Sequence, residues 1–220
     1  KKGLGQNFLT ARNILEEIVD AAEIESGVIE VGPGFGVLTS ELAQNSDKVV
    51  TIEIDERLID VLDYTLAEYD NVKIINEDIL KLDLTKVIDD EFNGEKVSIA
   101  ANLPYYITTP IITKLLEEKL PIKNIVVMVQ KEVAERMSAK PSTKDYGAIT
   151  VLCQYYTEPS IVANVPASLF VPPPKVDSAV LKLKVLDKPS VEVKDEGVFF
   201  RVVKAAFSQR RKTLLNCLSA

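Results

Sequence analysis

Short apolar runs alternate with amphipathic segments through the first two thirds of the chain. The runs are closed by turn-forming or polar residues, which is typical of buried strands, and they predict strands over residues 28–31, 49–53, 72–75, 96–101 and 124–129. Apolar positions at helical spacing predict helices between them, except between residues 76 and 95, where we predict none. Strands that alternate with helices in this way predict an α/β fold with a doubly wound, mostly parallel sheet.

The pattern changes after the polar stretch at residues 140–144. Residues 148–156 fit a helix or a strand by periodicity, and residues 161–165 and 178–185 predict two more strands, which makes a sheet of seven. The chain is basic and helical in pattern near its C-terminus. We therefore expect residues 1–196 to form one domain and residues 197–220 to begin a second, helical domain.

Composition excludes several classes of chemistry. The 220 residues include no histidine, which removes Ser-His-Asp and Cys-His catalysis and most zinc sites, so we expect no metal. Cys153 and Cys217 lie far apart without a CxxC spacing, which favours free thiols in the cytoplasm. The longest uncharged run, residues 97–113, contains Pro104 and Pro110 and is a poor membrane span, so no membrane association is expected.

The charge distribution limits how the chain could bind nucleic acid. A formal net charge of −7 argues against attachment by overall electrostatic attraction. Residues 197–220, however, carry five cations and no acidic residue. Any contact with RNA would therefore be confined to patches.

The stretch Asn102-Leu103-Pro104-Tyr105-Tyr106 follows a predicted strand, at the edge where open α/β sheets bind ligands. An asparagine amide can orient an amino group without acting as a base, and Pro104 favours an extended Leu103 whose carbonyl could face a ligand. With two tyrosines to stack on, these residues suit a planar base that carries an amine. A proline turn with aromatic residues closing a core explains the five residues equally well.

Acidic residues and glycines at three successive strand ends suggest a nucleoside-type cofactor. Gly32-Pro33-Gly34-Phe35-Gly36 differs from the dinucleotide fingerprint, because its third glycine comes one position early, and it suits adenosine joined to a sulfonium. Glu53 could accept both ribose hydroxyl protons, Asp78 could accept from the adenine amine, and Ile54 and Ile79 would flank the ring. The glycines alone could serve only a tight turn.

Four stretches together resemble the ribosomal RNA adenine N6,N6-dimethyltransferases, which use S-adenosyl-methionine and release S-adenosyl-homocysteine. The resemblance covers nearly the whole chain and implies a class I, Rossmann-like methyltransferase fold. The matching stretches are Gly5-Gln6-Asn7-Phe8-Leu9, Val31-Gly32-Pro33-Gly34-Phe35-Gly36, Asn102-Leu103-Pro104-Tyr105-Tyr106-Ile107-Thr108-Thr109-Pro110 and Phe170-Val171-Pro172-Pro173-Pro174-Lys175-Val176-Asp177-Ser178.

The resemblance also implies roles for individual residues. Asn102 would hold the methionine end and the target amine, while Tyr105 and Phe170 would stack on a flipped adenine from opposite sides. The implied catalytic residues are Asn102, Leu103, Pro104, Tyr105 and Phe170. The implied cofactor-binding residues are Asn7, Leu9, Gly32, Gly34, Glu53, Ile54, Asp78, Ile79 and Asn102.

Two branches of this family differ in substrate. The housekeeping branch dimethylates two adjacent adenosines near the 3′ end of 16S small-subunit ribosomal RNA during ribosome biogenesis, and the other methylates 23S large-subunit RNA and confers macrolide resistance. Leu103 and Tyr106, with the P-P-P-K-V-D-S-A stretch, resemble the housekeeping branch. The expected partner is then ribosomal RNA in a 30S particle, with residues 197–220 beginning a truncated RNA-binding domain, and a monomer is taken by default.

Three other functions remain open at this point. They are a nicotinamide-dependent dehydrogenase, a methyltransferase acting on a protein glutamine, and a ribosome assembly factor that binds without catalysis. The dehydrogenase predicts NAD binding without dependence on Asn102. Loss of methylation on replacing Asn102, with the fold retained, would separate an enzyme from a pure assembly factor.

Overall fold

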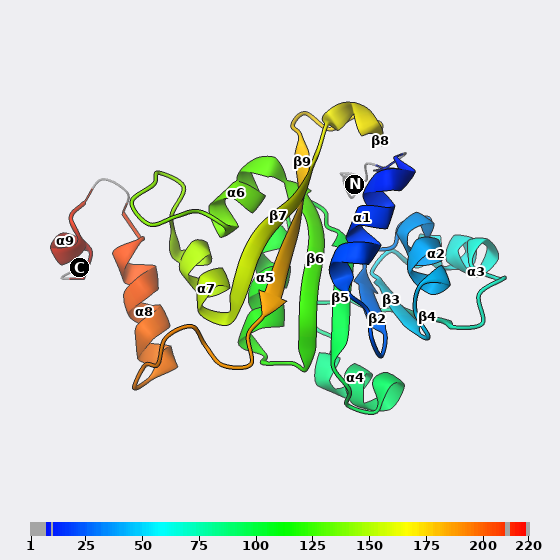
Figure 1. Ribbon diagram of the computed structural model, residues 1–220, viewed down its shortest axis with the longest axis horizontal. Coiled ribbons are helices and arrows are strands. Elements are labelled where there is room, and N and C mark those ends of the chain that lie inside the picture. The colour runs from blue at the N-terminus through cyan, green and yellow to red at the C-terminus, as the bar shows by residue number, and fades with distance from the viewer. Residues whose placement is uncertain (1–7, 10, 210–211, 219–220) are drawn as a thin grey trace.

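A seven-stranded sheet, ordered β4-β3-β2-β5-β6-β9-β7, forms the centre of the computed structural model, which describes residues 8–9, 11–209 and 212–218 (Figure 1). The neighbouring strands β4, β3, β2, β5 and β6 pair in parallel, and β9 pairs antiparallel with both β6 and β7. The predicted mostly parallel α/β sheet of seven strands is confirmed. Its strands are β2 (Val28–Val31), β3 (Val49–Glu53), β4 (Val72–Asn76), β5 (Val97–Asn102), β6 (Ile122–Gln130), β7 (Thr157–Val165) and β9 (Ser178–Val185).

Helices cover both faces of this sheet. Strand β5 shows why two cores form, since Ile99 and Ala101 pack into one hydrophobic cluster and Ala100 into the other. Helices α1 and α2 contribute to the cluster around Ala100, and α4 to α7 contribute to the opposite one. The helices of this part are α1 (Arg12–Ala22), α2 (Val37–Gln44), α3 (Ile59–Thr65), α4 (Leu84–Phe92), α5 (Thr108–Glu117), α6 (Lys131–Met137) and α7 (Ala148–Tyr156), with 3-10 turns at Glu56–Leu58 and Ala167–Leu169.

Helix α4 is a helix that the sequence pattern did not predict. Its apolar residues Leu84, Val87, Ile88 and Phe92 are buried on one face, and the Asp83 side chain accepts a hydrogen bond from the Lys86 N–H at 3.1 Å as an N-terminal cap. The ambiguous segment at residues 148–156 is a helix.

A second, two-stranded sheet lies apart from the main one. Strand β1 (Phe8–Leu9) pairs antiparallel with β8 (Phe170–Val171), and Leu9 lies opposite Phe170. The sequence pattern predicted neither of these two short strands, and their pairing joins residues 170–171 to the beginning of the chain.

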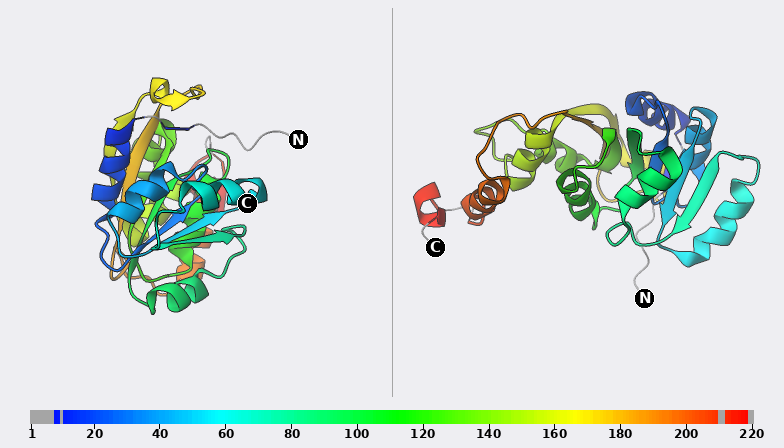
Figure 2. Two further views of the ribbon diagram at one scale, coloured as in Figure 1. Left: turned by 90° about the vertical axis from the view of Figure 1, so that its right-hand side faces the viewer. Right: turned by 90° about the horizontal axis from the view of Figure 1, so that it is seen from below.

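Helices α8 (Glu196–Ala206) and α9 (Leu214–Leu218) lie at the end of the molecule farthest from α3 (Figure 2). The Phe199 and Phe200 rings of α8 lie 5.3 Å and 5.2 Å from the Tyr155 ring of α7, measured between centroids. The division into domains at residue 196 stays a prediction. Among the described residues, no helix has both the length and the apolar character needed to cross a bilayer.

Candidate active site

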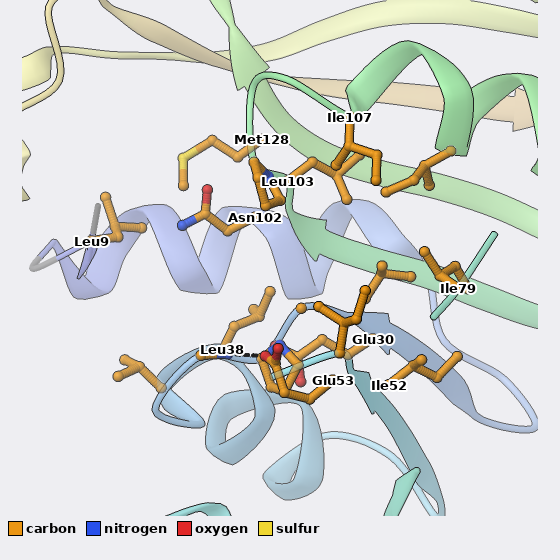
Figure 3. Close-up of a pocket in the computed structure, with 18 of the residues that line it drawn as sticks. Leu9, Glu30, Leu38, Ile52, Glu53, Ile79, Asn102, Leu103, Ile107 and Met128 are labelled. Atoms are coloured by element: carbon orange, nitrogen blue, oxygen red, sulfur yellow. Dashed lines mark hydrogen bonds between the residues drawn. The ribbon is translucent and has the colours of Figure 1, made fainter. Parts of the chain in front are cut away.

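A cleft opens at the carboxyl ends of β2, β3 and β5, and it encloses about 1290 Å³ with its open mouth included (Figure 3). It lies where ligands bind in open α/β sheets. Asn7 lies outside the described residues. All the other predicted site residues line this one cleft: Leu9, Gly32, Gly34, Glu53, Ile54, Asp78, Ile79, Asn102, Leu103, Pro104, Tyr105 and Phe170.

The glycines after β2 serve two different purposes. Gly32, Gly34 and Gly36 have φ angles of 70°, 60° and 83°, in the left-handed region that favours glycine. A Cβ on Gly36 would lie 3.1 Å from the Leu66 side chain, whereas a Cβ on Gly32 would meet no atom within 4 Å. Gly36 thus allows close packing on α3, and Gly32 leaves its backbone open to a ligand.

Glu53 is held in place by the two loops at its strand end. Its Oε1 accepts a hydrogen bond from the Asp55 N–H at 2.8 Å, and its Oε2 accepts one from the Gly34 N–H at 3.4 Å. Burial raises the pKa of this carboxyl above its ordinary value, while the two N–H groups oppose the shift. Because each carboxylate oxygen can accept more than one hydrogen bond, Glu53 can still receive ribose hydroxyls.

Glu30 is a second carboxylate in the wall of the cleft, and sequence reasoning placed it only in a strand. It is 1% exposed, and its Oε2 accepts hydrogen bonds from the hydroxyls of Thr39 at 2.5 Å and Thr51 at 3.2 Å. Burial, with a smaller effect of the Glu53 charge, raises the pKa of Glu30 to about 7. A charged residue inside the apolar run Val28-Ile29-Glu30-Val31 was the available signal, because a buried charge needs a specific partner.

The residues predicted to surround the adenine ring of the cofactor differ in their exposure to solvent. Ile54 is 55% exposed at the mouth of the cleft, while Ile79 is buried in its wall. The Asp78 Oδ1 accepts a hydrogen bond from the Leu80 N–H at 3.0 Å, and its Oδ2 lies 3.9 Å from the Lys81 Nζ. The hydrogen bond from Leu80 orients the carboxylate of Asp78 just beyond the end of β4.

The end of β5 positions Asn102 across the cleft from Glu30 and Glu53 (Figure 3). Asn102 lies opposite Met128 of β6, and the Leu103 N–H donates to the Met128 carbonyl at 3.1 Å. The Pro104 carbonyl accepts from the Ile107 N–H at 3.2 Å, which closes the turn into α5. Leu103 is thereby held between a strand and a turn, with its side chain buried.

The aromatic residues of the cleft lie in different surroundings. Tyr105 is half-buried, and its hydroxyl lies 2.8 Å from the Ser178 Oγ. Phe170 is 3% exposed, so only part of its ring can reach a ligand, whereas Tyr106 is 65% exposed. The structure brings Tyr105 and Phe170 to the same cleft, and their stacking on an adenine stays a prediction.

Comparisons with known proteins agree over almost the whole chain. The sequence model of a family described as "Ribosomal RNA adenine dimethylase" matches residues 1–220. "Ribosomal RNA small subunit methyltransferase A" of Alkaliphilus oremlandii is 56% identical over 220 residues, which cover 99% of this chain and 77% of that protein. The protein of the same name from Bacillus mycoides is 58% identical over 222 residues, with 100% of this chain and 76% of that protein covered.

Two solved structures are similar in both fold and sequence. A dimethyladenosine transferase from Plasmodium falciparum matches with a TM-score of 0.77 and 33% identity, over 97% of this chain and 75% of that one. The 23S rRNA methyltransferase ErmE matches with a TM-score of 0.77 and 30% identity, over 97% of this chain and 84% of that one.

Proposed function

Because the chain belongs to the ribosomal RNA adenine dimethylase family, we propose that it transfers methyl groups from S-adenosyl-methionine to N6 of adenines in small-subunit ribosomal RNA, dimethylating each. Identity of 56–58% to small-subunit methyltransferases, against 30% to a 23S enzyme, favours the housekeeping branch over the resistance branch. The dehydrogenase and the glutamine methyltransferase are set aside by the family.

The observation that carries this proposal is the convergence of Glu53, Asp78 and Asn102 on one cleft. The carboxylate oxygens of Glu53 can accept hydrogen bonds from the ribose of S-adenosyl-methionine. The open backbone at Gly32 leaves room for the cofactor to lie against the glycine loop. Asp78 would accept a hydrogen bond from the amine of the cofactor's adenine, Ile54 and Ile79 would flank that ring, and Leu9 would line the cofactor from the opposite segment. When bound, this cofactor supplies an electrophilic methyl group on a positively charged sulfur.

Asn102 and Leu103 would prepare the target amine. The N6 lone pair of adenine is delocalised into the ring. Hydrogen-bond acceptors that receive both amine hydrogens favour the pyramidal form of the amine, in which the lone pair can attack the methyl carbon. The Asn102 amide oxygen and the Leu103 carbonyl would be these acceptors. Held in this form, N6 would take the methyl group with the sulfur of the cofactor as leaving group, and the extra N6 proton would then pass to water. Positioning and electrostatics supply the catalysis, without a general base or a metal.

The target adenine must leave its stack to reach this cleft. That step costs a few kcal/mol, and it costs least for an unpaired base, so a structured RNA loop is the favoured target. We propose that the substrate is two adjacent adenosines near the 3′ end of 16S RNA, presented in a 30S particle. The enzyme would act as a monomer in the cytoplasm.

A labelled methyl group tests the proposal directly. The protein is incubated with methyl-labelled S-adenosyl-methionine and with small ribosomal subunits that lack the modification, or separately with unmodified 23S RNA, and the label is mapped by mass spectrometry. Two dimethylated adjacent adenosines in the small subunit are expected. Label in 23S RNA alone would move the enzyme to the resistance branch, and cofactor binding without label would favour an assembly factor.

A further inference from the structure

Ser178 is not among the described residues that line the cleft, but its hydroxyl contacts one that does, Tyr105. Ser178 is the first residue of β9, is fully buried, and lies opposite Gln130 of β6 and Val165 of β7. Its hydroxyl lies 2.8 Å from the hydroxyl of Tyr105, a residue 73 positions away in the sequence. The oxygen at the far end of the Tyr105 ring is thus anchored to the buried first residue of β9.

The residue before Ser178 contacts the turn that leads to the other aromatic residue of the cleft, Phe170. The Asp177 Oδ1 accepts a hydrogen bond from the Ala167 N–H at 2.9 Å, at the start of the 3-10 turn that leads to Phe170. The Asp177 carbonyl accepts from the Lys131 N–H at 3.0 Å, where α6 begins. One short segment of chain therefore connects to both Tyr105 and the loop that carries Phe170.

A tyrosine ring of this kind needs such an anchor. Tyr105 is half-buried beside a cleft, and a ring fixed only at its Cβ can rotate away from a ligand. A hydrogen bond at the opposite end of the ring limits that rotation, and side chains held by a supporting contact give the precise geometry that transfer reactions require. The buried sheet provides a rigid support, because Ser178 pairs with strands on both sides.

We infer that Ser178 is a positioning residue for methyl transfer, whose hydroxyl holds the Tyr105 ring in the orientation that receives the target adenine. This inference rests on the proposed function. It deepens that function by assigning to Ser178 a role in aligning the target base, distinct from binding the cofactor. Loss of the Ser178 hydroxyl should therefore slow transfer and leave affinity for S-adenosyl-methionine unchanged.

The test compares Ser178→Ala, Tyr105→Phe and the double variant. Each single variant is expected to lower kcat on small ribosomal subunits about tenfold, through misalignment, with the Kd for S-adenosyl-methionine within about twofold of the unmodified protein. The double variant should be no slower than the slower single variant, because both changes remove the same contact. Losses that multiply in the double variant would overturn the inference.

Ser98→Ala is the matched control. Ser98 is also a buried serine, 1% exposed, and its hydroxyl donates to the Ala22 carbonyl at 2.6 Å at the opposite end of β5 from Asn102. Both serine variants lose one buried hydrogen bond, so both should lower the melting temperature, but only Ser178→Ala should lower kcat well below that temperature. Equal kcat in the two variants would mean that Ser178 is merely structural.

A second measurement does not depend on the reaction. In protein with 13C-labelled tyrosine, the ring resonance of Tyr105, identified as the one absent from Tyr105→Phe, should shift in Ser178→Ala and stay in place in Ser98→Ala. An unmoved resonance would overturn the positioning role. Failure of the unmodified protein to methylate any small subunit would count against the proposed function alone, since the ring resonance still reports on Ser178.

Discussion

The Thr39 hydroxyl donates a hydrogen bond of 2.5 Å to the Glu30 carboxylate, which ties the helix after the glycine loop to the strand before it. Thr51 of the neighbouring strand donates to the same oxygen at 3.2 Å. The glycine loop is thus framed by a buried acid with two hydroxyl partners. This arrangement makes the stability of the cofactor cleft sensitive to pH.

Glu30 should lower the stability of the protein as pH rises. Its pKa is about 7 in the folded protein against an ordinary value of 4.5, so the folded state binds more protons than the unfolded state between these values. The free energy of unfolding should therefore fall through this window. In Glu30→Gln this contribution to the fall is absent, and at pH 8 the variant should be more stable than the unmodified protein by about 3 kcal/mol.

Urea unfolding at pH 5 and pH 8 measures this difference. Glu68→Gln, at an exposed position on the surface, is the control and should behave as the unmodified protein at both pH values. A Glu30→Gln variant that is less stable than the unmodified protein at pH 8 would show that the ionised carboxylate stabilises the fold.

Glu53→Gln should weaken cofactor binding. The Glu53 carboxylate accepts two backbone N–H groups and, in the proposed complex, two ribose hydroxyls, and hydrogen bonds to a charged acceptor contribute about 1.5–3 kcal/mol. Titration calorimetry should show the Kd for S-adenosyl-methionine rise about tenfold or more. Glu56→Gln, an exposed residue on the following turn, should leave the Kd unchanged, and equal affinities in both variants would contradict the assignment of Glu53.

Asn102→Ala should slow transfer far more than it weakens binding. Removing one preorganised hydrogen-bonding group from a reacting centre lowers kcat about a hundredfold or more. Single-turnover methylation of small subunits measures the rate, and the melting temperature should stay close to that of the unmodified protein. The comparison variant is Asn45→Ala, at an exposed helix end, and full methylation activity of Asn102→Ala would refute the role of Asn102 in preparing the target amine.

Gly32→Ala and Gly36→Ala should fail in different ways. Both positions have a positive φ, so each alanine strains the backbone by about 1 kcal/mol or more. At Gly36 the new methyl group would also press on Leu66, whereas at Gly32 it would project into open space beside the cleft. Thermal unfolding should show the larger loss of stability for Gly36→Ala, and calorimetry the larger loss of S-adenosyl-methionine affinity for Gly32→Ala. The reverse order would refute the division of roles between the two glycines.

The sequence predicted the strands and the site because both depend on short-range patterns. Glu53, Asp78 and Asn102 each follow an apolar run, and parallel strands bring their carboxyl ends to one edge. Every predicted site residue that the structure describes lines the cleft at that edge. Their roles toward the cofactor and the base stay predictions.

Some features that the sequence did not reveal depend on contacts between distant segments, and others are obscured by the local pattern. The contact of Tyr105 with Ser178 spans 73 positions and exists because β9 pairs with β6, an antiparallel register that no local pattern specifies. Glu30 was overlooked because β2 is buried on both faces, so the strand shows no alternation against which its side chain would stand out. Helix α4 was overlooked because its four buried residues lie within a strongly charged segment.

The pairing of Leu9 with Phe170 joins the two halves of the cleft, since the proposal gives Leu9 to the cofactor and Phe170 to the target base. If the cofactor binds against Leu9 and stabilises the pairing of β1 with β8, it also stabilises the position of Phe170 that the target base would contact. The same holds in the other direction for the RNA. Thermodynamic reciprocity then requires that RNA tighten cofactor binding by the same factor by which the cofactor tightens RNA binding, whichever ligand arrives first. Two dissociation constants, each measured with and without the other ligand, would give that factor twice.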